Sequence, residues 1–373
     1  MTFRLYTMVA ILLLSTMVFA QAPPPAATPQ MSSPAPSGPY PALSNAAEAR
    51  GRQIFEMWNS GQTGALWALF AENLKKNSGG EAKFAAYSKA LRERMGTETK
   101  MLNEDISPVM LMPGTVYNRL SQYSKIPTPV ATTIAIDERG QVLNLVVGPE
   151  QGPPEGRYAG YKDTAKLRLP FNGEWFVAQG GHTVFENNYM QSDEQKFALD
   201  FVLLKNGRAY TGDSSANESF YCFGQPILAP ADGTVIKVED GYVDNPPGKP
   251  SNDSPHGNLI VISHGNKEFS SIDHLKQNSA KVKRGDAVKQ GDPIAECGNS
   301  GNSPGPHVHF QFQNTAGFPT ADPLPAQFNN YIANGKLVAV GEPVKGQVVS
   351  NAPTMGGNPP TGKDVPKPAP VTK

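Results

Sequence analysis

The chain has 373 residues, and its 33 lysines and arginines balance 33 aspartates and glutamates, so its formal net charge is zero. A neutral chain has no basic footprint, and we expect no nucleic-acid partner. The length is sufficient for two domains. The two cysteines, Cys222 and Cys297, are too few for a disulfide framework or a cysteine-based metal site. They could pair once in an oxidising compartment, but we favour two separate buried thiols.

Residues 1–20 are typical of a secretory signal peptide. Arg4 supplies a positive charge, an apolar run covers Val9–Val18, and small-residue cleavage sites follow at Ala20 and Ala22. The run is short for a membrane span, and an uncleaved anchor is the alternative. No cysteine follows the run to carry a lipid anchor. We therefore expect an exported protein, periplasmic or extracellular, with no membrane span after cleavage.

Proline is concentrated near both ends of the chain. Residues 21–42 are rich in proline, alanine and serine and cannot build a core, so they are predicted to be a disordered tether. Residues 331–373 have a similar composition with scattered lysines, and the sequence predicts a disordered tail there.

A first ordered block covers residues 43–148. Apolar residues recur at helical spacing, and glycines at 61, 64 and 96 punctuate them, which predicts three helices within residues 46–95. Strands are predicted at Val116–Ser124, Pro129–Ile136 and Gln141–Val147, with a hairpin loop between the last two. Helices followed by an antiparallel sheet indicate a small α+β domain, and its aromatic stripes are best explained as core.

Residues 149–165 are interpreted as a linker, and residues 166–330 are strand-like throughout. Short turns such as Asp232-Gly233 and Gln290-Gly291 recur at short intervals, which is typical of an all-β sandwich or barrel. The whole chain is therefore predicted to be mainly β, with the small α+β domain in front.

Two histidines stand out in the loop and strand formed by residues 298–313. Alternation along a strand places His307, His309, Gln311 and Gln313 on one face. The two histidines would then lie roughly 6–7 Å apart at the backbone. This spacing suits one histidine on a metal and the other facing whatever the metal holds. A solvated polar face that happens to carry two histidines is the alternative.

Asp200 and His274 are further candidates. Asp200 alternates with Phe197, Leu199 and Phe201, and a carboxylate within an apolar strand is costly to bury unless it is paired or bound to a metal. An exposed strand edge is the alternative. His274 follows another predicted strand, whereas histidines 256 and 264 precede Gly-Asn pairs and are typical of turns. One aspartate and three separated histidines suit a zinc hydrolase, in which an open coordination position holds water.

These residues carry a resemblance to a known family. Residues 175–325 resemble the lysostaphin/LytM-type zinc endopeptidases of peptidase family M23, which cut peptides of bacterial cell-wall peptidoglycan. The resemblance lies in these motifs: Gly180–Thr183, Asn188-Tyr189, Gln195–Asp200, Ala229–Val235, Val288–Asp292, Gly298–Gly301 and His307–Phe310. It implies a compact antiparallel β-sheet with an open groove, a zinc cofactor and a peptidoglycan peptide as partner. The first block, in turn, resembles accessory domains found ahead of some exported peptidases.

By position, the resemblance implies that Asp200 and His309 bind zinc. It implies that His307 faces the substrate and the activated water, and that His307 and His274 together polarise water and stabilise the oxyanion of the tetrahedral intermediate.

One position departs from the family pattern. Where the resemblance implies the first zinc-binding histidine, the chain has Met190, and a thioether is a poor zinc ligand. His182 could replace it, or could be a surface histidine in a glycine-rich turn. Two functions follow: an exported zinc endopeptidase acting on peptidoglycan cross-links, or a degenerate, non-catalytic fold. The degenerate fold would bind cell-wall peptide or regulate a partner wall hydrolase.

Overall fold

The computed structural model describes residues 41–108, 114–150, 158, 160–317 and 321–353. The predicted signal peptide, nearly all of the predicted tether and the chain from residue 354 onwards lie outside these residues. Among the described residues, no helix is both long and apolar enough to cross a membrane.

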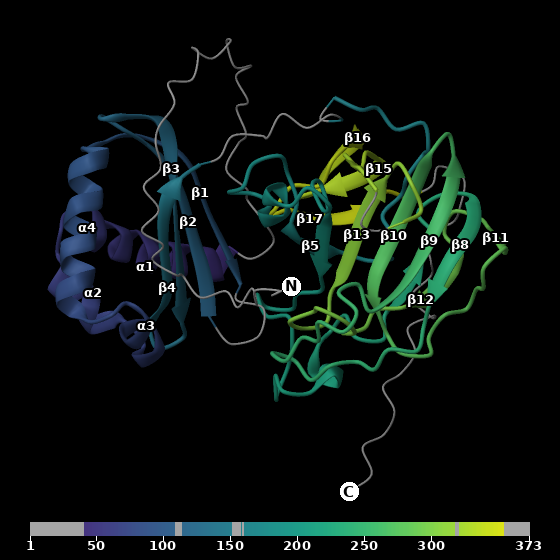
Figure 1. Ribbon diagram of the computed structural model, residues 1–373, viewed down its shortest axis with the longest axis horizontal. Helices are drawn as coiled ribbons and strands as arrows, with labels where there is room; N and C mark the ends of the chain where they lie inside the picture. Colours follow the sequence, from purple (N-terminus) through teal and green to yellow (C-terminus); the bar gives the residue numbers. More distant parts are fainter. Residues whose placement is uncertain (1–40, 109–113, 151–157, 159, 318–320, 354–373) are drawn as a thin grey trace, which may run out of the picture.

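The first part of the chain is a four-stranded antiparallel sheet with helices on one face (Figure 1). The helices are α1 (Pro41–Asn59), α2 (Thr63–Leu69), α3 (Glu72–Asn77) and α4 (Glu81–Met95). The strands are β1 (Glu98–Pro108), β2 (Gly114–Tyr123), β3 (Ile126–Asp137) and β4 (Val142–Pro149), paired in that order. The predicted α+β class is confirmed, although the sequence did not predict β1 or the short helix α3.

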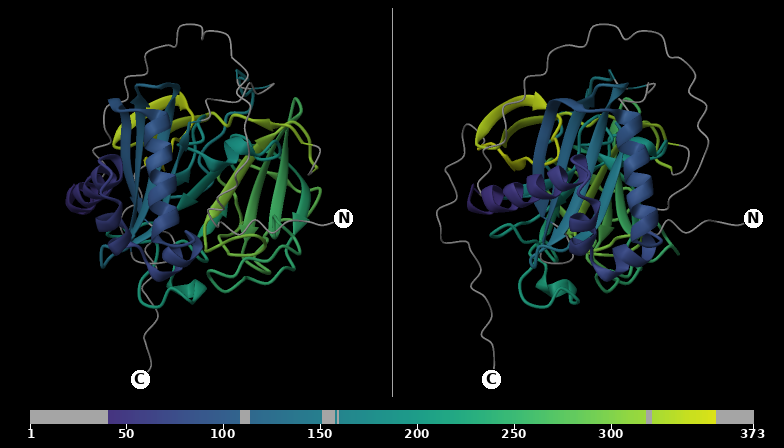
Figure 2. Two further views of the ribbon diagram at one scale, coloured as in Figure 1. Left: turned by 60° about the vertical axis from the view of Figure 1, so that its left-hand side comes forward. Right: turned by 90° about the vertical axis from the view of Figure 1, so that its left-hand side faces the viewer.

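Helix α1 lies very close to the sheet. A Cβ atom at Gly51 would come within 2.4 Å of the Tyr117 ring on β2, so only glycine permits this approach. Ile54, Phe55 and Trp58 of the same helix are buried against the sheet. The apolar stripe predicted from the sequence is thus the core of this part. Figure 2 shows that the helices lie on the side of the sheet away from the second part of the chain.

The second part is built on an 11-stranded sheet with the order β11-β8-β9-β10-β13-β6-β5-β17-β15-β16, and β14 pairs with β13. Its strands are β5 (Trp175–Gln179), β6 (Leu199–Val202), β8 (Gly233–Glu239), β9 (Asn258–Gly265), β10 (Glu268–Leu275), β11 (Ala287–Val288), β13 (Val308–Gln313), β14 (Pro323–Leu324), β15 (Phe328–Ala333), β16 (Lys336–Gly341) and β17 (Val348–Asn351). A separate pair joins β7 (Pro226–Leu228) to β12 (Pro293–Glu296).

Both faces of the central strand β13 are buried. Val308, Phe310 and Phe312 belong to the main apolar core, as the alternation predicted. The opposite face is also covered, because His309 is 1% exposed and Gln311 is 0% exposed. The alternative of a solvated polar face is therefore wrong. These polar side chains must find partners inside the protein, since an unpaired buried polar group is costly.

The predicted disordered tail from residue 331 is wrong as far as residue 351. Strand β17 pairs with β5, placing Val348 opposite Phe176, and it also pairs with β15. Val349 is 0% exposed within the main core. Composition gave no warning of this, because the strands are stabilised by partners distant in the sequence. Cys222 and Cys297 are both buried and unbridged, as we favoured.

The strands after residue 330 provide a stability prediction. Ending the chain after residue 330 removes β16, β17 and the buried Tyr331 and Val349, and leaves β5 without its outer neighbour. We expect a loss of several kcal/mol in the free energy of unfolding, measured by denaturant titration. Removing only residues 354–373 is the control, and equal midpoints for the two truncations would contradict the pairing.

Candidate metal centre

His274 is directed into the site by an irregularity of its strand. The pairing of β10 with β9 shifts register between Ile272 and Leu275, and His274 has a φ of 61°. A non-glycine residue in this left-handed region costs about 1–3 kcal/mol, which the surrounding structure must supply. The residue before the bend, Asp273, still pairs with His309 of β13, so the bulge brings His274 beside that strand.

Backbone carbonyls fix the tautomers of two histidines. His274 donates from Nδ1 to the carbonyl oxygen of Ser300 at 2.9 Å, and His307 donates from Nδ1 to that of Gly305 at 2.8 Å. A carbonyl can only accept, so each neutral ring carries its proton on Nδ1. Each Nε2 therefore has a free lone pair, suited to bind a metal or to take up a proton.

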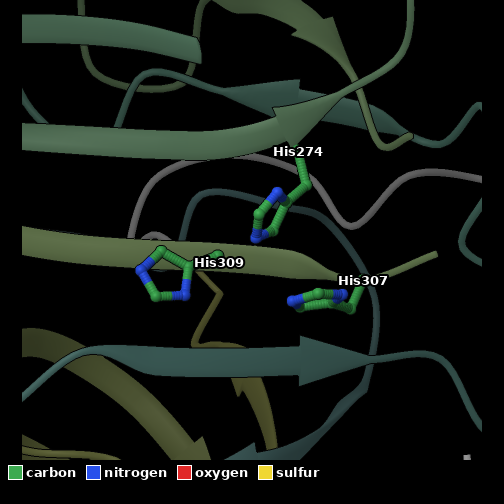
Figure 3. A group of neighbouring side chains, drawn as sticks. All are labelled: His274, His307 and His309. Atoms are coloured by element: carbon green, nitrogen blue, oxygen red, sulfur yellow. The ribbon is translucent and has the colours of Figure 1, made fainter. Parts of the chain in front are cut away.

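Three histidines converge on one space. The ligand atoms of His274, His307 and His309 all lie within 4.8 Å of one another, and all three residues are buried. The ring centroid of His274 is 4.9 Å from that of His307 and 5.7 Å from that of His309. Figure 3 shows the His274 ring entering from a neighbouring strand between the other two rings. The cluster could hold a metal ion.

Asp200 completes the cluster from strand β6. It pairs with His309 across the two strands, and its Oδ1 lies 3.0 Å from Nδ1 of His309 and 3.6 Å from Nε2 of His307. Tetrahedral zinc with bonds of 2.0–2.2 Å holds its ligands about 3.3–3.6 Å apart. The 3.6 Å between Asp200 and His307 lies in this range, and the 3.0 Å hydrogen bond between Asp200 and His309 is slightly shorter. One carboxylate and two imidazole nitrogens, the donor types that zinc takes, are thus close to zinc-ligand spacing, although the chain supplies no strong donor at position 190.

Burial and charge tune these groups in different directions. Burial lowers the pKa of His274 to about 3, with the neighbouring histidines adding to the effect, so this ring stays neutral. Burial alone would raise the pKa of Asp200, but His307 and His309 hold it below the ordinary value. Burial likewise opposes the charged form of His309, yet its bond to Asp200 raises the pKa of the ring. The lowered pKa values thus favour an anionic Asp200 and a neutral His274 in the same site.

Residues proposed for the third ligand position do not join the cluster. Met190 is buried in η1 (Asn188–Gln191), and no interaction described for it reaches Asp200 or His309. His182 contacts Glu342 instead, with Nε2 and Oε2 2.5 Å apart. The interpretation of position 190 as a departure stays a prediction, and the structure gives replacement by His182 no support.

A buried pair that sequence reasoning missed lies behind His274. Asp273 is 1% exposed, and its Oδ2 lies 2.7 Å from Nδ1 of His256. Its other oxygen accepts from the Ser271 hydroxyl. The usable signal was an acidic residue directly before His274, at the end of a strand. His256 lies in a turn, as predicted. His264, also predicted in a turn, is at the end of β9 and contacts the Asp232 carbonyl outside the cluster.

Comparison with known proteins identifies the second part. The model of peptidase family M23 matches residues 218–321, which contain all three clustered histidines. The second part of the chain contains an M23 peptidase domain. Asp200, Tyr189 and Met190 precede the matched range, so the family match covers only one side of the site.

Two relatives that align with part of this chain come from bacteria. An uncharacterized metalloprotease of Haemophilus influenzae is 37% identical over 89 residues, covering 24% of this chain and 16% of that protein. The peptidoglycan DD-endopeptidase ShyC of Vibrio cholerae is 34% identical over 89 residues, covering 24% and 19%. The chain thus aligns with less than a fifth of either relative. The catalytic domain of lysostaphin from Staphylococcus simulans is 21% identical, covering 44% of this chain and 89% of that one, with a TM-score of 0.23.

The buried pair behind His274 predicts a pH effect on the M23 domain. Burial would raise the pKa of Asp273, but His256 lowers it to about 2, below the ordinary value of about 3.9. Such a carboxylate stabilises the fold above about pH 4, and the stabilisation is lost as pH falls towards 2. Asp273→Asn should lower the free energy of unfolding by about 3 kcal/mol near pH 6. Denaturant titrations should show the difference shrinking below pH 4; a constant difference would count against the pair.

Proposed function

We propose that the M23 domain is an exported zinc endopeptidase that hydrolyses peptide cross-links of bacterial peptidoglycan. The observation that carries the proposal is the convergence of Asp200 Oδ1 with the ring nitrogens of His307 and His309, 3.6 Å and 3.0 Å away. ShyC, which shares the domain, is named a peptidoglycan DD-endopeptidase. In this proposal the first part of the chain is an accessory domain, and the protein acts in the cell envelope.

The side chains divide the work in this proposal. Asp200 and His309 would hold zinc, which when bound would act as a Lewis acid and polarise the scissile carbonyl. His274 remains neutral because burial lowers its pKa, so its Nε2 accepts a hydrogen bond and orients the attacking water. His307 takes up the proton of that water at Nε2 and, once protonated, stabilises the developing oxyanion. Its Nδ1 bond to the Gly305 carbonyl keeps the ring in position throughout.

Met190 favours a second candidate function. A site with two of three expected ligands binds zinc more weakly by orders of magnitude, since each ligand contributes to the binding free energy. The domain would then be a non-catalytic module that binds cell-wall peptide or regulates a partner wall hydrolase. The intact set of Asp200, His274, His307 and His309 supports the enzyme more than the module.

Metal analysis of the purified chain tests the proposal. We expect close to one zinc ion per chain by mass spectrometry and release of peptides from purified peptidoglycan. Asp200→Ala and His309→Ala should each lose the metal and the activity, because each removes a donor. His182→Ala is the matched control, since this histidine contacts Glu342 outside the cluster and should leave zinc content unchanged.

Substitution at position 190 separates the two functions. If the wild type holds zinc and cleaves peptidoglycan, the endopeptidase is the correct function. Met190→His should then only raise the affinity for zinc. If the wild type is metal-free and only Met190→His gains zinc and wall-lytic activity, the non-catalytic module is the correct function. The measurements are zinc titration against a chromophoric chelator and chromatography of released peptides.

A further inference from the structure

Tyr189 precedes Met190, the position that departs from the family pattern, and it contacts the candidate metal centre directly. Its hydroxyl donates to Oδ2 of Asp200 at 3.0 Å. Its ring lies edge-on to the ring of His309, with centroids 5.1 Å apart and planes at 85°. Tyr189 therefore touches both residues proposed to hold zinc, whereas no described interaction joins its neighbour Met190 to either.

The segment that carries Tyr189 is fixed by buried polar contacts. Asn187 is 0% exposed, its Oδ1 accepts from the Tyr189 backbone amide at 3.1 Å, and its Nδ2 donates to the Ala198 carbonyl at 2.9 Å. Ala198 lies two residues before Asp200. The Gln179 side chain accepts from the Asn188 amide at 3.0 Å, which ties the segment to β5 as well. The position of the tyrosine is thus set by the strands that frame the site.

A carboxylate group offers two equivalent oxygens, and the torsion that exchanges them is soft. In this site the two oxygens have different partners, because Oδ2 accepts from Tyr189 and Oδ1 faces His307 and His309. Tyr189 is half-buried, and its hydroxyl donates to Oδ2 of Asp200. Its bond therefore selects which oxygen of Asp200 remains for the histidines and for a metal.

We propose that Tyr189 is a positioning residue of the metal centre, which orients Asp200 and partly compensates for the missing donor at position 190. The proposal rests on the metal centre of the proposed function. Polar groups that orient metal ligands typically change metal affinity 10–100-fold when they are removed. The contribution of Tyr189 to metal affinity is larger here, because fewer protein donors bind the metal.

Tyr189→Phe is the sharpest test, because it keeps the ring against His309 and removes only the hydroxyl. We expect zinc affinity to fall 10–100-fold in competition with a chromophoric chelator. We also expect the visible absorption of the Co²⁺ form to change, because a freed carboxylate alters the coordination geometry. Tyr161→Phe is the matched control: its hydroxyl also bonds a buried carboxylate, that of Glu268 at 2.9 Å, but away from the site. It should leave both readouts unchanged.

The outcomes separate this inference from the enzymatic proposal. If Tyr189→Phe folds, as judged by its unfolding transition, and matches the wild type in zinc affinity and Co²⁺ spectrum, the inference is overturned. If the wild type binds neither zinc nor Co²⁺, the inference falls together with the metal centre. If the predicted losses occur but the wild type does not cleave peptidoglycan, the inference stands and the endopeptidase proposal fails. Should Tyr189→Phe not fold, Asn187→Ala, which releases the same segment, must show the affinity loss.

Discussion

The candidate site depends on one cross-strand pair, Asp200 on β6 opposite His309 on β13. An ionised carboxylate inside a sheet is expensive to desolvate, and only close partners repay that cost. Asp200 has three: the Tyr189 hydroxyl, the His309 ring and, slightly further away, the His307 ring. The pair fixes the register of the two central strands, because a one-residue shift of either strand would turn its own side chain to the opposite face and separate the two.

Much of the second part could be predicted because its signals are local. Alternation placed His307 and His309 on the face opposite Val308 and Phe310, and β13 has this arrangement. The strand-rich composition predicted the mainly β class. The last strands were missed because β17 is stabilised by pairing with β5, more than half the ordered domain away in sequence. Local composition carries no information about such a partner.

The finer geometry of the site could not be predicted for the same physical reason. The left-handed φ of His274 is imposed by a bulge between two strands, and nothing in its neighbouring residues demands it. The tautomers of His274 and His307 follow from carbonyls in loops that fold back against the strands. The sequence did not predict the contact between Asp273 and His256, because these residues are brought together only by the fold. Side-chain chemistry was visible in the sequence, whereas the partners that tune it were not.

Position 190 raises a conflict between holding a metal and moving protons. Asp200 and His309 are two of the three protein ligands that a catalytic zinc site uses, so zinc held by them would leave room for further nitrogen ligands. Nε2 of His307 lies 3.6 Å from Asp200 Oδ1, which is within the spacing of a shared metal shell. A lone pair given to the metal cannot accept a proton, so each gain in affinity through His307 would remove a base from the reaction. Orienting Asp200 through Tyr189, as we propose, would avoid this conflict, because it would strengthen Asp200 as a ligand and leave the histidine lone pairs free.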